Sequence, residues 1–545
     1  MSFRPPTVVI ENVNPLIDGG RYPVKRCVSE DFIVTADIFK DGHDVLSAVL
    51  KWRRQGAQKW HETPMTCVDP WNKDRWRGTC SFFEVGPYDV TIEAWGDLFF
   101  SWQHEYDAKF NAQQPDLTSE MLEGAQFVER AAEQAAAIGQ KFDAQRLSAF
   151  ATEMRGAGPE RVHVLAHLGE LEALMTAYSD RRDSTHFTLN SEETLRFATP
   201  APVKPAPKAK ASEKKKAALI SATPVAEPAP DVAPEYPKMW IDRERAGFAA
   251  WYEFFPRSAE GRGDKGSTFR DCLPRVDDAK AMGFDVIYFP PVHPVGVTAR
   301  KGRNNSVTCE PGEPGVPYAI GNRLQKCPNG GGHKDVAPEL GTLADFDWLV
   351  KEIRARGMEV ALDFAINCSP DHPYVHAHPE WFYQRPDGTI KYAENPPKKY
   401  QDVYPMNFHN PNWRALWDEL TSVIEFWCEH DVRIFRVDNP HTKPVAFWEY
   451  LIGRVQRRWP DAIFLSEAFT RPKMMHALAK AGYTQSYTYF TWRNTKEGLA
   501  EYFAHLTQDP VSEVMRPNLF PNTPDILPSY LQFGGRPAFI VRAVL

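Results

Sequence analysis

The stretch LADFDWLVKEIRARG at 343–357, followed directly by MEVALDFAI at 358–366, indicates the fold. Apolar residues three and four positions apart predict a helix in the first part. Its buried face would consist of Leu343, Phe346, Leu349, Val350 and Ile353. Gly357 is a typical helix stop, and the almost continuously apolar run after it is typical of a strand covered on both faces of a parallel sheet. The stretch therefore predicts one helix–strand unit of an α/β protein.

The same unit recurs at 277–292, 415–438 and 446–468. Such a repeat predicts a (β/α)8-type barrel over 238–545, with an inserted loop domain at 366–411. Seven barrel strands can be placed, near 248–255, 284–289, 358–365, 432–437, 462–467, 484–490 and 517–522. The sequence ends shortly after the seventh, so we expect a barrel truncated near its eighth strand. Because an open sheet edge promotes aggregation, we expect the chain as given to be poorly soluble and nearly inactive.

Three segments with a different pattern precede the barrel. Short alternating strands separated by turn residues predict an N-terminal β-sandwich at 1–105. Residues 106–198 are rich in Ala, Glu, Gln and Leu and predict helices, whose apolar faces would be covered either by another subunit or by the domain's own sheet. Residues 199–237 are rich in Pro and Lys and predict a linker.

Composition excludes several classes of protein. The 545 residues carry 64 basic and 71 acidic side chains, a formal net charge of -7, which argues against nucleic-acid binding. Apolar runs stay below the ~18 residues that span a bilayer, and the first residues lack a signal-peptide core. Eight scattered cysteines without a CxxC pair are typical of a cytoplasmic protein with reduced thiols. We expect no metal, no cofactor, no nucleic acid and no membrane association.

Polar side chains end the predicted barrel strands, where the active site of a (β/α) barrel is built. They are Asp363, Asn367, Arg436, Asp438, Asn439, Glu467, Asn522 and Asp525. A single acid there could simply cap the next helix. Arg436 and Asp438, however, lie two residues apart on one strand and point the same way, so the guanidinium would keep this carboxylate ionised. An ionised carboxylate facing a protonated one is the arrangement that glycosyl transfer requires.

These strand ends resemble the motif regions of the α-amylase superfamily, glycoside hydrolase family 13, and in particular its maltosyltransferases that use maltose 1-phosphate. The motifs are AWYEFFPRS at 250–258, DFAINCSPDHP at 363–373, NPPKKYQDVYPMNF at 395–408, FRVDNPHTKP at 435–444, LSEAFTRPKMM at 465–475 and NTPDILPSYLQFGGRPAF at 522–539. Cys368 replaces the histidine of most amylases, which speaks against an ordinary amylase.

The resemblance implies an enzyme that moves maltose from α-maltose 1-phosphate to the non-reducing end of an α-1,4-glucan, in cytoplasmic glycogen-like synthesis. It implies that Asp438 is the nucleophile, Glu467 the acid–base, and Asp525 the transition-state stabiliser, with Arg436 holding Asp438. The phosphate would be bound by Asn395, Lys398, Tyr400 and Asn439, and the donor site lined by Lys301, Asn367 and Asp402. Clustered donors around Lys398 also suit a dianion on physical grounds.

Two alternatives stay open at this point. One is an α-amylase-like hydrolase, which phosphate dependence of the reaction would exclude. The other is an inactive glycan-binding fragment, which binding without turnover would support. The resemblance also implies a homodimer formed through the helical segment.

Overall fold

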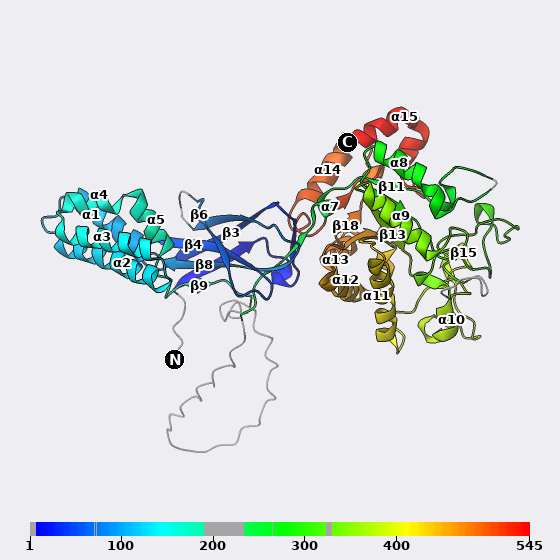
Figure 1. The fold of residues 1–545 in the computed structure, drawn as a ribbon, viewed down its shortest axis with the longest axis horizontal. Helices are drawn as coiled ribbons and strands as arrows, with labels where there is room; N and C mark the ends of the chain where they lie inside the picture. Colours follow the sequence, from blue (N-terminus) through cyan, green and yellow to red (C-terminus); the bar gives the residue numbers. More distant parts are fainter. Residues whose placement is uncertain (1–6, 70, 72–73, 190–233, 264, 323–329) are drawn as a thin grey trace, which may run out of the picture. The chain divides into compact units, whose positions relative to one another are not determined.

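The computed structural model describes residues 7–69, 71, 74–189, 234–263, 265–322 and 330–545. The chain divides into two compact units (Figure 1). The first unit contains Met1–Arg21, Asp31–Cys80 and Tyr88–Met239, and the second contains Tyr22–Glu30, Ser81–Pro87 and Trp240–Leu545. The linker expected at 199–237 lies almost entirely outside the described residues.

Antiparallel strands begin the first unit, as predicted. One sheet has the order β1-β3-β7-β6, with strands Val8–Asn14, Asp31–Lys40, Arg75–Ser81 and Thr66–Cys67. The other contains β8, β4 and β5, at Gly86–Gly96, Leu46–Arg54 and His61–Pro64. The short strand β9 (Thr185–His186) pairs with β8, although a helical segment was predicted there. In β3 the buried positions alternate, which gives the strand one core face.

Five helices follow the sheets and form a bundle with its own core. They are α1 (Leu98–Asn111), α2 (Thr118–Ala137), α3 (Lys141–Gly156), α4 (Pro159–Ala166) and α5 (Gly169–Ala177). The first helix starts at Leu98 because the Asp97 side chain accepts a hydrogen bond from the Phe100 N–H, so the predicted boundary at 105 is wrong. Trp102, Tyr106 and Leu147 are buried together with residues of the other helices. The apolar faces of the helices therefore cover one another. We had expected them to be covered by another subunit or by the domain's own sheet.

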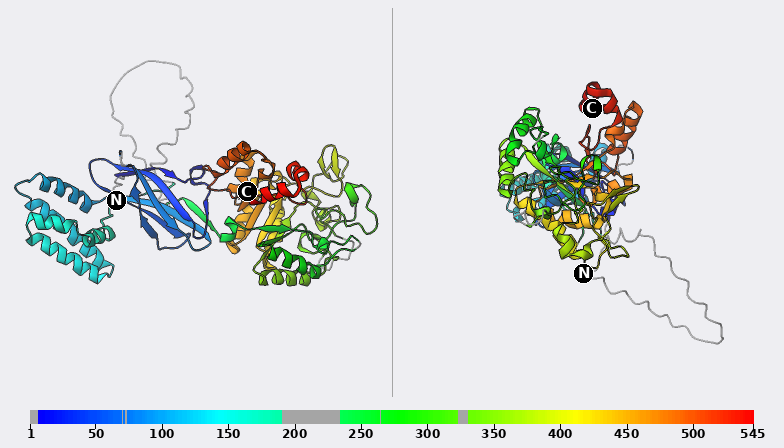
Figure 2. Two further views of the ribbon diagram at one scale, coloured as in Figure 1. Left: turned by 90° about the horizontal axis from the view of Figure 1, so that it is seen from above. Right: turned by 90° about the vertical axis from the view of Figure 1, so that its right-hand side faces the viewer.

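The second unit is built on a seven-stranded parallel sheet with the order β11-β12-β13-β16-β17-β18-β19 (Figures 1 and 2). Its strands are Trp251–Glu253, Val286–Phe289, Glu359–Phe364, Ile434–Asp438, Ile463–Glu467, Gln485–Tyr487 and Pro517–Asn518. Six of them lie inside the predicted ranges, β16 ends one residue beyond its range of 432–437, and the order follows the sequence. The seven predicted strands are confirmed.

Helices alternate with these strands. They are α8 (Leu273–Ala281), α9 (Leu343–Ala355), α11 (Trp413–Glu429), α12 (Val445–Arg458), α13 (Pro472–Lys480), α14 (Lys496–Thr507) and α15 (Ser529–Val544). Thr342 and Asp345 form a reciprocal capping box that starts α9, and Gly357 follows its end with φ 71°. Of the five residues predicted on the buried face of α9, Phe346, Leu349, Val350 and Ile353 are buried, whereas Leu343 at the start of the helix is only partly buried.

Smaller elements complete this unit. The chain enters it through β2 (Val24–Cys27) and β10 (Lys238–Asp242), which pair, and then α7 (Glu244–Gly247). The predicted insertion after β13 holds α10 (Pro373–Ala377) and the hairpin of β14 (Ala393–Asn395) and β15 (Lys398–Tyr400). None of the described helices combines the length and the apolar composition that crossing a bilayer requires.

The parallel register divides the sheet residues between two faces. Ile287, Leu362, Phe435 and Phe464 belong to the large core shared with the helices. Tyr288, Ala361, Ile434 and Ile463 form a separate small cluster on the opposite face. Because side chains alternate along a strand, Asp363, Arg436 and Leu465 continue this second face toward the carboxyl ends of the strands. The polar strand ends therefore meet on one side of the sheet.

We predict that Gly124→Ala destabilises the helical bundle. A Cβ at Gly124 in α2 would lie 2.1 Å from the buried ring of Trp102, whose Nε1–H donates to the Glu120 carbonyl. Overpacking of this kind typically costs about 1–3 kcal/mol. The matched control is Gly156→Ala at the end of α3, where a Cβ meets nothing within 4 Å and should be neutral or stabilise by up to about 1 kcal/mol. Urea unfolding followed by circular dichroism measures both, and a Gly124→Ala protein as stable as wild type would refute the clash.

Candidate active site

The guanidinium of Arg436 on β16 is the centre of the site. Arg436 is 4% exposed, and its Nη1 donates to Asp363 Oδ2 and to Asp438 Oδ1, each at 3.0 Å. Its Nη2 lies 3.3 Å from Glu467 Oε1. The sheet register explains the convergence, because Arg436 is opposite Asp363 on β13 and Asp438 is opposite Glu467 on β17. Three adjacent strands thus place three carboxyl groups around one buried cation.

Asp363 is the most deeply buried of these acids. Its Oδ2 accepts hydrogen bonds from Tyr288 Oη at 2.5 Å and Tyr318 Oη at 3.0 Å, besides the bond from Arg436. Burial raises the pKa of Asp363, while Arg436 opposes the rise. Sequence reasoning missed both tyrosines. Strand alternation places Tyr288 on this face, whereas Tyr318 lies in a loop far from the strand in sequence.

Glu467 and Asp438 are register partners at the ends of neighbouring strands. Burial raises the pKa of Glu467 to about 7, with Asp438 raising it further and Arg436 opposing. Its Oε2 accepts a hydrogen bond of 3.1 Å from the backbone N–H of Asn439, which has the left-handed conformation with φ 45°. Near neutral pH Glu467 can therefore both give and take a proton. Asp438 receives a charge-assisted hydrogen bond from Arg436 Nη1 at 3.0 Å.

Glu253 at the end of β11 is a further carboxyl group on this face. It is opposite Tyr288 in the register between β11 and β12. Burial raises the pKa of Glu253 to about 8, and Arg436 is the strongest opposing charge. Alternation along AWYEFF at 250–255 was the signal that could have identified it. Glu253 is therefore neutral when the site is at neutral pH.

Asp525 joins the site from the loop after β19. Its side chain is exposed, and its backbone N–H donates to Thr523 Oγ1 at 3.2 Å. Burial is the main cause of the raised pKa of Glu253, Arg436 opposes it, and the charges of Asp363 and Asp525 add to it. The structure thus brings Asp525 near the Arg436 cluster.

The residues expected at the donor lie around the insertion after β13. Lys301 is buried, and its Nζ donates to Gln401 Oε1 at 2.7 Å. Neighbouring Asp402 is also buried, which raises its pKa, while the Lys301 charge lowers it. Asn395 and Lys398 are exposed register partners on the β14–β15 hairpin, with Tyr400 half-buried at its end, and Asn367 is half-buried after β13.

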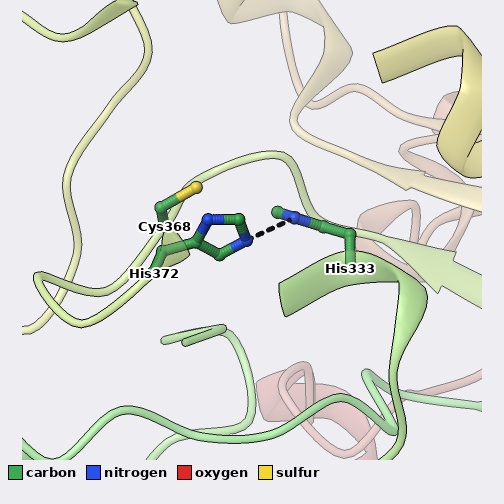
Figure 3. A group of neighbouring side chains, drawn as sticks. All are labelled: His333, Cys368 and His372. Carbon is green, nitrogen blue, oxygen red and sulfur yellow. Dashed lines mark hydrogen bonds between the residues drawn. The ribbon is translucent and has the colours of Figure 1, made fainter. Parts of the chain in front are cut away.

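A group of three side chains, His333, Cys368 and His372, has the composition of a metal site (Figure 3). Its hydrogen bonds argue otherwise. His333 Nε2 donates to the Ala365 carbonyl at 2.7 Å, which leaves Nδ1 as an acceptor. His372 Nδ1 accepts from the Tyr374 N–H, so His372 Nε2 carries the proton and donates to His333 Nδ1 at 3.0 Å. Every ring nitrogen is satisfied with both rings neutral, so the pair is a structural support beneath the insertion.

Comparison with known proteins identifies the family. A model for the α-1,4-glucan:maltose-1-phosphate maltosyltransferase domain N/S matches residues 6–191. The α-1,4-glucan:maltose-1-phosphate maltosyltransferase of Myxococcus xanthus is 45% identical over 549 residues, covering 100% of this chain and 74% of that protein. Its counterpart in Pseudomonas aeruginosa is 43% identical over 547 residues, covering 100% and 73%. An α-amylase structure from Lactobacillus plantarum is 25% identical over 48% of this chain and 59% of that chain, with a TM-score of 0.37.

A parallel α/β sheet with an arginine and paired carboxyl groups at its strand ends is the arrangement of glycosyl-transferring enzymes of the α-amylase type. Within that class, the chain belongs to the α-1,4-glucan:maltose-1-phosphate maltosyltransferase family.

We predict that the second unit loses stability as the pH falls below about 6.5. Burial lowers the pKa of His293 to about 4 and of His333 to about 3, and lowers that of His372 as well. In the unfolded chain these histidines have an ordinary pKa near 6.5, so below that pH the unfolded chain binds protons that the folded chain does not bind. The free energy of unfolding therefore falls as the pH falls, by up to about 1.4 kcal/mol per pH unit for each histidine.

Urea unfolding between pH 7.5 and 5 tests this expectation. His293→Gln should lessen the pH slope, whereas the control His376→Gln, at an exposed position in α10, should leave it unchanged. Equal slopes in all three proteins would show that the buried histidines do not control acid stability.

Proposed function

We propose that this chain transfers maltose from α-maltose 1-phosphate to the non-reducing end of α-1,4-glucans, with release of phosphate and retention of configuration. The observation that carries the proposal is the identity of 45% to a maltosyltransferase along the whole chain. The convergence of Asp438 and Glu467 on Arg436 supplies the chemistry. The named relatives act on α-1,4-glucan and maltose 1-phosphate, and the same substrates fit this site.

The first step forms a glycosyl enzyme. An ionised Asp438 attacks the anomeric carbon of the donor while the bond from that carbon to the phosphate oxygen breaks. Glu467 gives its proton to the departing phosphate, which its pKa of about 7 allows. Arg436 holds Asp438 in place through its hydrogen bond, and Asp525 stabilises the oxocarbenium-like transition state.

The second step transfers maltose. The 4-hydroxyl oxygen of the glucan attacks the anomeric carbon, the ester bond to Asp438 breaks, and the hydroxyl proton moves to Glu467. Two inversions give net retention. Glu467 ends the cycle protonated, ready for another donor.

Phosphate binding is assigned to the β14–β15 hairpin and to the segment after β16. The exposed Asn395 and Lys398, together with Tyr400 and Asn439, offer hydrogen-bond donors to a dianion. Lys301, Asn367 and Asp402 line the donor site. A charged donor site of this kind favours a phosphorylated maltosyl donor over the hydrolytic alternative.

Closure of the seven-stranded sheet into a (β/α)8-type barrel, a cytoplasmic location and a homodimer remain predictions. The bundle of α1–α5 buries its own apolar residues, so the need to cover these faces no longer supports a dimer. The charge and geometry of the Arg436 cluster do not bear on the oligomeric state.

We predict that Asp438→Asn abolishes phosphate release. An amide cannot form the ester intermediate, so activity should fall by at least about a hundredfold without loss of fold. The test is incubation of the wild-type and variant chains with α-maltose 1-phosphate and maltohexaose, with phosphate and glucan length followed together. Phosphate release by wild type without glucan elongation would indicate a hydrolase, and glucan binding without phosphate release would indicate an inactive binder.

We also predict a loss of kcat/KM above about pH 7 with α-maltose 1-phosphate. The acid is needed in its protonated form, and raising the pH through the Glu467 pKa removes that proton. Glu467→Gln should lower the rate by about 10²–10⁴-fold with this donor but much less in the first step with α-maltosyl fluoride, whose leaving group needs no proton. Glu497→Gln, at an exposed position in α14, is the control. Equal losses with both donors would assign the proton transfer to another group.

A further inference from the structure

A second group of possible metal ligands lies in the helical bundle, remote in sequence from the catalytic residues. Asp107 comes from α1, His163 from α4, and His167 directly follows α4. The motif HVLAH at 163–167 places both imidazoles four residues apart, which puts them on one face of a helix. Such spacing is typical of histidine pairs that share a metal ion, and it was visible in the sequence although we expected no metal.

The donor atoms lie at the separations that a small cation requires. Asp107 Oδ1 is 3.1 Å from His163 Nδ1 and forms a hydrogen bond of 3.0 Å with His167 Nε2. All three ligand atoms lie within 4.8 Å of one another. Ligands of a tetrahedral zinc ion, with bonds near 2.0–2.1 Å, are separated by about 3.3 Å. A zinc ion could therefore bind with only small shifts of these side chains.

One ring nitrogen of His163 has, among the described residues, no hydrogen bond that would explain its position. Its Nδ1 is buried, yet within the described residues it makes no hydrogen bond, despite its distance of 3.1 Å from Asp107 Oδ1. His163 and Asp107 thus lie close together without the alignment that a hydrogen bond requires, whereas His167 Nε2 and Asp107 Oδ1 are hydrogen-bonded. A shared cation would give His163 Nδ1 a partner and would replace the hydrogen bond of His167. The ring is held in place by stacking on Phe110, with centroids 4.4 Å apart and planes 12° apart.

The surroundings of His167 suit a ligand as well. A histidine that binds metal through Nε2 must carry its proton on Nδ1, normally facing a carboxylate. Glu172 Oε1 of α5 lies 3.7 Å from His167 Nδ1. Gln103 Nε2 lies 3.3 Å from the same atom, but its two hydrogens have the Ala166 carbonyl at 2.8 Å and Glu172 Oε1 at 3.1 Å as acceptors. His167 Nδ1 is therefore able to keep its proton and to face Glu172.

We propose that Asp107, His163 and His167 bind a divalent zinc ion, with water as the fourth ligand. Two imidazoles and one carboxylate form a donor set that zinc and similar transition metals prefer over magnesium or calcium. The ion would tie α4 to α1, and through Glu172 also α5, so its role is to stabilise the bundle. The site takes no part in the maltosyl transfer proposed above, and neither proposal depends on the other.

The test uses the full chain, purified in the presence of chelator and then titrated with Co²⁺ and Zn²⁺. We expect one Co²⁺ per chain with the visible absorption of a tetrahedral N/O site, displaced by Zn²⁺, and a thermal transition that Zn²⁺ shifts upward. Asp107→Asn and His167→Gln each remove a direct ligand. Loss of a residue that only supports a ligand typically lowers metal affinity roughly 10–100-fold, so each of these variants should lower the affinity for Co²⁺ and Zn²⁺ by more than that. The matched control His104→Gln removes an exposed histidine from the same helix and should bind like wild type.

Several results would overturn the proposal. The first is that the wild-type chain does not bind one ion per chain, and the second is that both ligand variants bind like wild type. The third is that binding is lost in His167→Gln but kept in Asp107→Asn, which would mean that the histidine pair binds the ion without the carboxylate. Thiolate-to-cobalt charge-transfer absorption would instead place the ion at a cysteine. Circular dichroism of each variant shows whether it folds. Asp107 lies in α1 and His167 directly follows α4, so if one variant misfolds the other still provides the test.

Discussion

The buried charge of Arg436 is the interaction on which the active side of the sheet depends. A guanidinium that is 4% exposed has lost most of its hydration, and only nearby carboxylates can replace it. Three strands supply them, through Asp363, Asp438 and Glu467. Burial raises the pKa of Glu467 to about 7 and that of Glu253 to about 8, while Arg436 opposes both shifts and the neighbouring acids add to them. The strand ends thus hold Asp438 in a hydrogen bond with Arg436 and, beside it, carboxyl groups that still bind a proton near neutral pH.

Much of the second unit could be predicted because its decisive signals are local. Helix spacing, a glycine stop and an apolar run identify α9 and β13 within 343–366, and the same unit repeats along the chain. The first unit was predicted less well because its key contacts are not local. Asp97 caps α1 eight residues before the predicted boundary. Strand β9 pairs with β8 although the five helices of the bundle lie between them in the sequence. Amino-acid composition predicts that a segment is helical, but helix caps and strand pairing determine where each helix and strand begins and ends.

The candidate site divides in the same way. Arg436, Asp438 and Glu467 could be identified from strand ends, since strand alternation places such residues on one face and at one edge. Tyr318 could not, because a loop brings its hydroxyl to Asp363 from 45 residues away in sequence. Glu253 follows the alternation rule, but its altered acidity comes from burial and charge, which one strand does not reveal. Residue types and spacing thus indicated the chemistry, while the electrostatic tuning required the assembled sheet.

The two histidine groups show how hydrogen bonding separates similar compositions. His333 and His372 have one arrangement of protons that satisfies all four ring nitrogens, and this arrangement leaves no lone pair for a metal. His163 has a buried nitrogen that faces a carboxylate oxygen without a hydrogen bond to it. A buried nitrogen that is left in this way costs free energy, and a cation shared with Asp107 and His167 removes that cost. Ligand atoms lie close together in both groups, and His167 also has a hydrogen bond to Asp107. The difference between the groups is therefore His163 Nδ1, which is buried and has no hydrogen bond among the described residues.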